Sequence, residues 1–247
     1  MTDAAKSHRI VIGATCYADA SSVIEIGCYL AESTKGELQA ILIEEDAVYN
    51  LSALPSAQVT PVGGVSRPVT PEAMLEAFRR DAAAYEKAIR ARFAKRAIRW
   101  SFEKRRGEFP VVLNHDLSTG DVLVFGYQAM RRGVGELLVV DYANDMDVSL
   151  VELASNVAQE MRRDLHVVLL RKSPEAAIRV SEHSRSRMER LATNLTIMDK
   201  QDSVETLLDT IRRGRVGTVM ISAALSRDIG LGRLLDTARC PVSVYTS

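Results

Sequence analysis

Apolar residues follow two alternating patterns along this chain of 247 residues. Short continuous apolar runs, such as RIVIGA at residues 9–14, alternate with stretches such as residues 23–30, where apolar residues recur every three or four positions. A continuous run predicts a strand buried on both faces, and the second spacing predicts a helix with one apolar face. Buried strands joined through helices form parallel sheets, so the pattern predicts an α/β protein.

The chain contains an internal repeat. Residues 9–44 match residues 136–171 without a gap, so that RIVIGA corresponds to ELLVVD and LQAILI corresponds to LHVVLL. Each copy therefore has the order strand, helix, strand. A repeat of this length predicts two copies of one domain, which we place at residues 1–130 and 136–247. We expect each copy to be an open parallel sheet flanked by helices.

The two copies are predicted to differ in length. Residues 51–70 are rich in Pro, Gly, Ser and Val without a helical period, which predicts a long loop inserted in the first copy. After DVLVFG the first copy has too few residues for another helix and strand. The second copy continues after GTVMIS through a predicted helix at Leu231–Thr237 into CPVSVYTS. We therefore expect four strands in the first copy and five in the second.

Two short motifs predict where further helices begin. Thr70-Pro71-Glu72 and Ser173-Pro174-Glu175 each offer a hydroxyl for capping, a proline for the first helical position and an acidic first turn. All three features favour the amino end of a helix. Each copy is thus expected to contain a second long helix.

Composition and charge exclude several classes of protein. The Lys and Arg residues number 32, as do the Asp and Glu residues, so no overall field attracts nucleic acid or an anionic membrane. No apolar run is long enough to span a membrane, and the first residues do not resemble a secretory signal. The three cysteines are far apart and in no metal-binding spacing. We expect a cytoplasmic protein without metal, membrane or nucleic-acid partners.

Three segments resemble the universal stress protein family. They are the turn GEFP at residues 107–110, the strand DVLVFG, and LLDTARCPVSVY at residues 234–245. The resemblance covers nearly the whole chain as a tandem pair and leaves out only residues 51–70. It implies two domains of the adenine-nucleotide-hydrolase-like fold and a role in stress response.

The same resemblance implies where a nucleotide would bind. Family members that bind ATP have an aspartate at the end of the first strand, and the matching position is Asp141 in the second copy but Ala14 in the first. They also have a glycine-rich phosphate loop after the fourth strand, where the second copy has Ser222 and Leu225 in place of two glycines. No cofactor is expected beyond weakly bound adenine nucleotide. The candidate binding residues are Asp141, Tyr142, Gly126, Gly230 and Gly232.

Two other groups of residues were weighed as sites. His115 and Asp116 are a histidine and a carboxylate adjacent in sequence, a pairing that by itself forms no catalytic dyad. Residues 79–106 are strongly basic. This charge suits an acidic partner, nucleic-acid phosphates or a signalling ligand, or else the solvated face of a long amphipathic helix. No catalytic motif is present, so no catalytic residue is assigned and an enzyme is not the expected class.

Two functional hypotheses follow. The first is a regulatory stress protein that binds a protein partner or a ligand and retains a degenerate ATP-binding motif. The alternative is an adenine-nucleotide-binding sensor or enzyme of the same superfamily that uses a divergent loop. Because family domains pair through their last strands, the strand at Pro241–Thr246 also predicts a homodimer.

Overall fold

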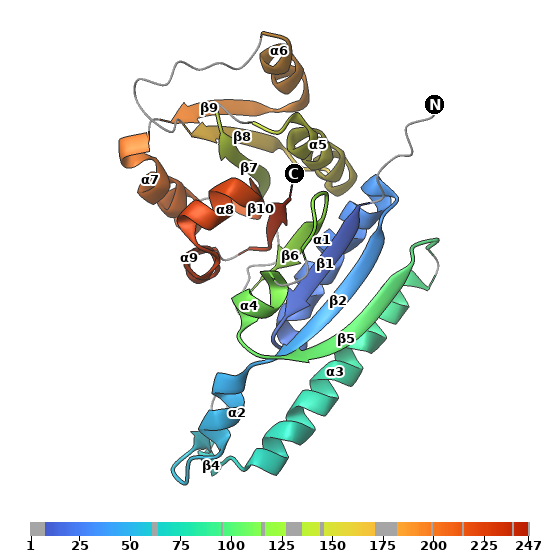
Figure 1. Ribbon diagram of the computed structural model, residues 1–247, viewed down its shortest axis with the longest axis vertical. Coiled ribbons are helices and arrows are strands. Elements are labelled where there is room, and N and C mark those ends of the chain that lie inside the picture. Colours follow the sequence, from blue (N-terminus) through green and yellow to red (C-terminus); the bar gives the residue numbers. More distant parts are fainter. Residues whose placement is uncertain are drawn as a thin grey trace.

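The main feature of the molecule is one large β-sheet flanked by helices (Figure 1). The computed structural model describes residues 8–60, 64–94, 96–114, 117–126, 135–143, 146–170, 182–198, 200–213, 215–238 and 240–246. Within them, nine strands form this sheet in the order β5-β2-β1-β6-β11-β10-β7-β8-β9. The mostly parallel sheet confirms the predicted α/β class.

The sheet consists of two parallel halves that meet in an antiparallel seam. The pairs β1–β6 and β10–β11 are parallel, whereas β6 and β11 run in opposite directions with Val122 opposite Tyr245. One half comes from residues 9–125 and the other from residues 136–245. The strands are β1 (Arg9–Ala14), β2 (Glu37–Glu44), β5 (Trp100–Arg106), β6 (Val122–Phe125), β7 (Glu136–Tyr142), β8 (Leu165–Leu170), β9 (Asn194–Met198), β10 (Val216–Ser222) and β11 (Val242–Tyr245).

Helices cover both faces of the sheet, each over its own apolar core. One core contains buried side chains of α1, α3, α5 and α6, and the other contains buried side chains of α4, α7, α8 and α9. No helix in the described residues is long and apolar enough to cross a membrane. The helices are α1 (Tyr17–Thr34), α2 (Asp46–Ser52), α3 (Pro71–Phe93), α4 (Phe109–Asn114), α5 (Val148–Met161), α6 (Glu182–Leu191), α7 (Lys200–Arg213), α8 (Ala223–Ile229) and α9 (Leu231–Thr237).

The first of the two predicted helix starts is confirmed. Helix α3 begins at Pro71, and the hydroxyl of Thr70 accepts a hydrogen bond from the main-chain N–H of Ala73 at 3.2 Å. The second motif, Ser173-Pro174-Glu175, lies outside the described residues.

The segment predicted as a loop at residues 51–70 contains regular structure. It begins inside α2 and continues into a small hairpin of β3 (Gln58–Val59) and β4 (Arg67–Pro68). Residues 46–52 form a helix, and Asp46 lies in its first turn, a location where an acid is favourable. We call residues 46–60 and 64–75 the arm; they contain α2, the described residues of this hairpin and the start of α3, and they project from the sheet in Figure 1.

The predicted homodimer interface, pairing through the C-terminal strand β11, is wrong. Both edges of β11 are used within the chain, one by β10 and the other by β6. The first half ends at its fourth large strand, β6, which would otherwise leave an open edge. The last strand of the second half fills that edge, so it offers no template to another molecule.

Candidate functional site

Two of the candidate nucleotide residues, Asp141 and Tyr142, lie at the end of β7, beside the end of β10. These neighbouring parallel strands pair Val140 with Ile221, which brings Asp141 next to Ser222. Helix α8 begins directly after Ser222. The carboxyl ends of strands are where open α/β sheets usually bind ligands, so this is the expected edge for a site.

The carboxylate of Asp141 is held by the chain itself. Its Oδ1 accepts the main-chain N–H of Tyr142 at 2.8 Å, and its Oδ2 accepts the N–H of Asp147 at 2.9 Å. Only 2% of Asp141 is exposed. Burial raises the pKa of this carboxyl, while hydrogen bonds from Ser222 and from the two main-chain groups act in the opposite direction. Asp141 therefore ties the end of β7 to the start of α5 and to β10.

Tyr142, at the end of β7, connects this strand to α8. Its hydroxyl donates a hydrogen bond to the carboxylate of Asp228 on α8, and the residue is buried. Burial, followed by the bond to Asp228, raises the pKa of the Tyr142 hydroxyl. The side chain thus links β7 to α8 at this edge of the sheet.

The amino end of α8 occupies the place of the expected phosphate loop. The hydroxyl of Ser222 accepts the N–H of Leu225 at 3.4 Å, so one of the helix's free donors is already used. The side chain of Leu225 is fully buried in the core. A phosphate loop needs several converging main-chain donors and little side-chain bulk. In this turn one donor is already bonded, and Leu225 stands where a glycine was expected.

The three candidate glycines do not gather around Asp141. Gly126 follows β6, and two strands, β11 and β10, separate β6 from β7. Gly230 joins α8 to α9 with a φ of 88°, and its N–H donates to the carbonyl of Ser226. Gly232 lies in the first turn of α9 and is exposed. Gly230 therefore has a local role, because its positive φ suits a turn between two short helices.

Sequence reasoning missed Asp147 and Asp228. A signal for Asp147 was present, because its carboxylate accepts the N–H of Ser149 at 2.9 Å as an N-cap just before the helical pattern of α5. No signal pointed to Asp228, which meets Tyr142 only through the packing of α8 on β7. Among the described residues, no group of three or more His, Cys, Asp or Glu side chains is arranged to hold a metal ion.

The basic segment at residues 79–106 is spread along α3 and β5 and is largely paired. Eight of its eleven cations lie within 4.0 Å of carboxylates on the same or neighbouring elements, which matches the interpretation as a solvated surface. His115 and Asp116 lie outside the described residues. The ion pairs are Arg79–Glu76, Arg80–Glu76, Arg90–Glu86, Arg96–Glu32, Arg99–Glu37, Lys104–Glu44, Arg105–Glu103 and Arg106–Asp46.

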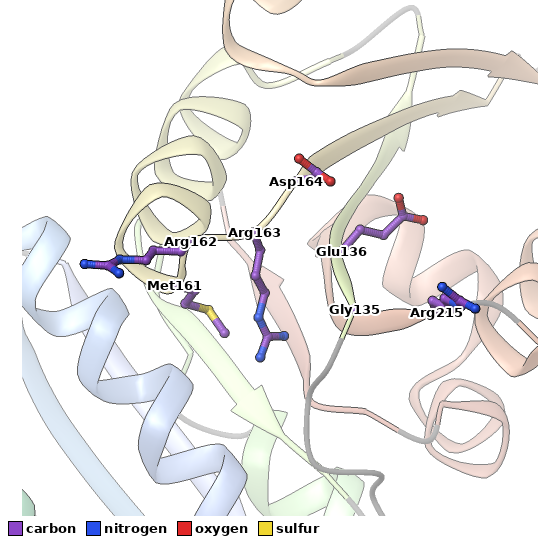
Figure 2. A pocket seen from close by; sticks show the side chains of 7 residues that line it. All are labelled: Gly135, Glu136, Met161, Arg162, Arg163, Asp164 and Arg215. Carbon is purple, nitrogen blue, oxygen red and sulfur yellow. The ribbon is translucent and has the colours of Figure 1, made fainter.

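A hollow of about 570 Å³ lies at the opposite edge of the second half, near the amino ends of its strands. Three arginines, Arg162, Arg163 and Arg215, contribute to its lining together with Glu136 and Asp164. Figure 2 shows that Arg163 extends into the hollow, whereas Arg162 points away from it. Because the guanidinium groups do not converge and two carboxylates accompany them, the hollow is a poor fit for a single anion.

Among known proteins, this chain resembles solved structures but matches no family model. No family model matches the chain, and no curated protein matches it. The chain is similar to a universal stress protein from Archaeoglobus fulgidus DSM 4304, with 10% identity, a TM-score of 0.49 and coverage of 98% of this chain and 97% of that chain. A candidate universal stress protein from Pseudomonas aeruginosa UCBPP-PA14 has 14% identity, a TM-score of 0.47 and coverage of 98% and 94%. A protein of unknown function from Pseudomonas aeruginosa PAO1 has 13% identity, a TM-score of 0.49 and coverage of 98% and 93%. Function has to be inferred from the chain's own residues.

Proposed function

We propose that this chain is a universal stress protein-like regulatory protein that acts by binding another molecule and carries a degenerate ATP-binding motif. The observation that carries the proposal is that the Asp141 carboxylate is buried and already hydrogen-bonded within the chain. Its two carboxylate oxygens accept main-chain N–H groups of Tyr142 and Asp147, and the side chain is buried. Because only 2% of Asp141 is exposed, an adenine could reach the carboxylate only if neighbouring groups moved, and a buried N–H that lost its acceptor in this way would cost about 1–3 kcal/mol.

The turn after β10 supports the same proposal. The N–H of Leu225 is capped by Ser222, and the Leu225 side chain fills core space beneath the turn. The phosphates of ATP would therefore find few free donors here. Any nucleotide binding at this edge should depend on the base and not on the phosphates.

The arm offers a surface that a protein partner could contact. Its exposed apolar side chains come from four consecutive parts of the chain, and exposed apolar patches of this kind often mark protein interfaces. In Figure 1 the arm extends beyond the body of the sheet. These side chains are Leu51, Leu54, Val59, Val65 and Leu75.

The alternative function is an adenine-nucleotide sensor that uses the same edge. The location of Asp141 favours it, because this carboxylate ends a strand at the edge where α/β sheets bind ligands. A carboxylate has room for about four hydrogen bonds, so Asp141 could accept one more from an adenine amino group.

Calorimetry with ATP and with adenosine separates the two functions. Under the first proposal ATP binds no more tightly than adenosine, and nucleotide is absent from the protein when it is purified under native conditions and examined by mass spectrometry. Ser222→Gly is a matched variant that frees the N–H of Leu225 and should not improve ATP binding. Tight ATP binding that is lost in Asp141→Asn would establish the sensor instead.

A further inference from the structure

The two outer strands of the sheet differ in charge. β5 carries Glu103, Lys104, Arg105 and Arg106 in succession, and charged side chains at an edge discourage pairing with another strand. β9 at the other end has the sequence NLTIM and no charged residue. Within the described residues no strand pairs with the outer edge of β9. One end of the sheet is therefore protected, and the other is open.

The main-chain groups that face this open edge can be identified. On the neighbouring strand β8, the carbonyls of Asp164 and Leu170 accept the N–H groups of Leu137 and Ala143, so the even-numbered residues of β8 face β7 and its odd-numbered residues face β9. Main-chain groups along a strand point alternately to its two sides. Because His166 faces β7 and is paired with Asn194, the main-chain groups of Asn194, Thr196 and Met198 face β8. The N–H and C=O groups of Leu195 and Ile197 consequently point outward from the sheet.

We propose that a second copy of this chain pairs its own β9 with this edge, antiparallel, around a twofold axis at Thr196. In this register Thr196 faces Thr196 of the partner subunit, and Asn194 faces Met198 of the partner subunit. The same register places Leu195 opposite Ile197 of the partner subunit, and both residues present outward main-chain groups, so the hydrogen-bonding positions of the two strands coincide. A twofold axis requires that each strand be complementary to itself, and this register meets that condition.

The side chains favour a second copy over an unrelated strand. On one face of the strand, Leu195 would lie opposite Ile197 of the partner subunit, which forms an apolar pair. Ile197 is 38% exposed in the single chain, so this pairing would cover apolar surface. On the other face, the central pair is two threonines, which form favourable cross-strand contacts. No like charges meet anywhere along the five residues of β9.

This dimer goes beyond the proposed function and is compatible with it. In Figure 1 the arm and β9 lie at opposite ends of the molecule. Pairing through β9 would leave both arms accessible, so the dimer would present two copies of the proposed partner surface. Bivalent binding would follow without any new contact to the partner.

The position of Thr196 on the proposed axis allows a charge-swap test. We expect the full chain to be a dimer by sedimentation velocity at tens of micromolar. Thr196→Lys and Thr196→Glu each place like charges opposite one another, and each should weaken the dimer by about tenfold or more. An equimolar mixture of the two variants should restore dimerisation, since opposite charges then meet at the axis.

Thr196→Val is the matched control. It also loses the contact between the Thr196 hydroxyl and Nε2 of His166, which are 2.9 Å apart, but it keeps the main-chain N–H and adds no charge. This variant should remain dimeric, and thermal unfolding should show that all three variants are folded. A monomeric wild type overturns the proposal. So does a wild-type dimer that neither charged variant weakens, or a dimer that Leu54→Glu in the arm disrupts instead.

Discussion

Val124 of β6 lies directly opposite Ser243 of β11 in the antiparallel seam that joins the two halves of the sheet. Ser243 is fully buried, and its hydroxyl has no hydrogen-bond partner within the described residues. Burying a polar group without a partner costs about 1–3 kcal/mol. We expect Ser243→Ala to raise the free energy of unfolding by about 1 kcal/mol, as measured by urea denaturation.

The neighbouring pair in the seam provides the control. Leu123 lies opposite Val244 and is fully buried. Leu123→Ala should lower the free energy of unfolding by about 2–5 kcal/mol, because it leaves a cavity at the junction. If the seam holds the halves together, both variants should unfold in one transition. Two separate transitions in Leu123→Ala would show that the halves unfold independently.

The seam also shows what the sequence could and could not predict. The apolar runs gave the strands correctly because each run is buried on both faces, as in LHVVLL, which forms β8 at Leu165–Leu170. The pairing partner of CPVSVYTS could not be read in the same way. Main-chain hydrogen bonds do not depend on the side chains. The sequence of a strand that pairs within the chain therefore resembles the sequence of one that pairs with another molecule.

The contacts of the candidate site could not be predicted from the sequence either. Asp141 was found because it ends an apolar run and matches a family position. Its partners were not found, since the N–H of Asp147 is a main-chain group and the Asp228 carboxylate comes from a distant helix. Whether a strand-ending aspartate receives a ligand or holds its own chain depends on such contacts.

Arg106 anchors the arm to the sheet. Its guanidinium lies 2.5 Å from the carboxylate of Asp46 and stacks over the ring of Tyr49 at 4.2 Å from the centroid. Both partners belong to α2, and the ion pair is about half exposed, so its contribution to global stability should be small. Arg106→Ala should therefore speed hydrogen exchange in α2 without a measurable change in melting temperature.

Arg106→Lys tests which contact matters in the arm. A lysine keeps the positive charge but lacks the planar guanidinium that stacks on an aromatic ring. If stacking on Tyr49 holds α2, the lysine variant should exchange nearly as fast as the alanine variant. Protection equal to that of the wild type would assign the role to the ion pair with Asp46.

Tyr85 contains a second buried hydroxyl without a partner in the described residues. The residue is fully buried on α3, and its ring meets that of Phe102 edge to face at 5.6 Å. Tyr85→Phe keeps this ring contact and removes the hydroxyl, so the variant should be as stable as the wild type or more stable. Tyr85→Ala should lose about 3–5 kcal/mol in the free energy of unfolding. A clear loss of stability in Tyr85→Phe would mean that the hydroxyl has a partner.

Asp141 should make stability depend on pH in an unusual direction. Burial raises its pKa in the folded state, so the native protein holds this proton more tightly than the unfolded chain does. The contribution of Asp141 to the free energy of unfolding must then increase as the pH falls through the raised pKa. It becomes complete below the unfolded value of about 3.9.

Comparison with Asp141→Asn isolates this contribution, because the other acidic groups titrate in both proteins. Asparagine offers one acceptor oxygen, whereas Tyr142 and Asp147 need two, so the variant should be less stable at neutral pH by about 1–3 kcal/mol. The difference in free energy of unfolding between the wild type and Asp141→Asn should increase as the pH falls. Ser222→Ala removes a hydrogen bond that lowers the Asp141 pKa, and it should move the onset of this widening to higher pH. A difference that stays constant or narrows on acidification would show that the folded pKa of Asp141 is not raised.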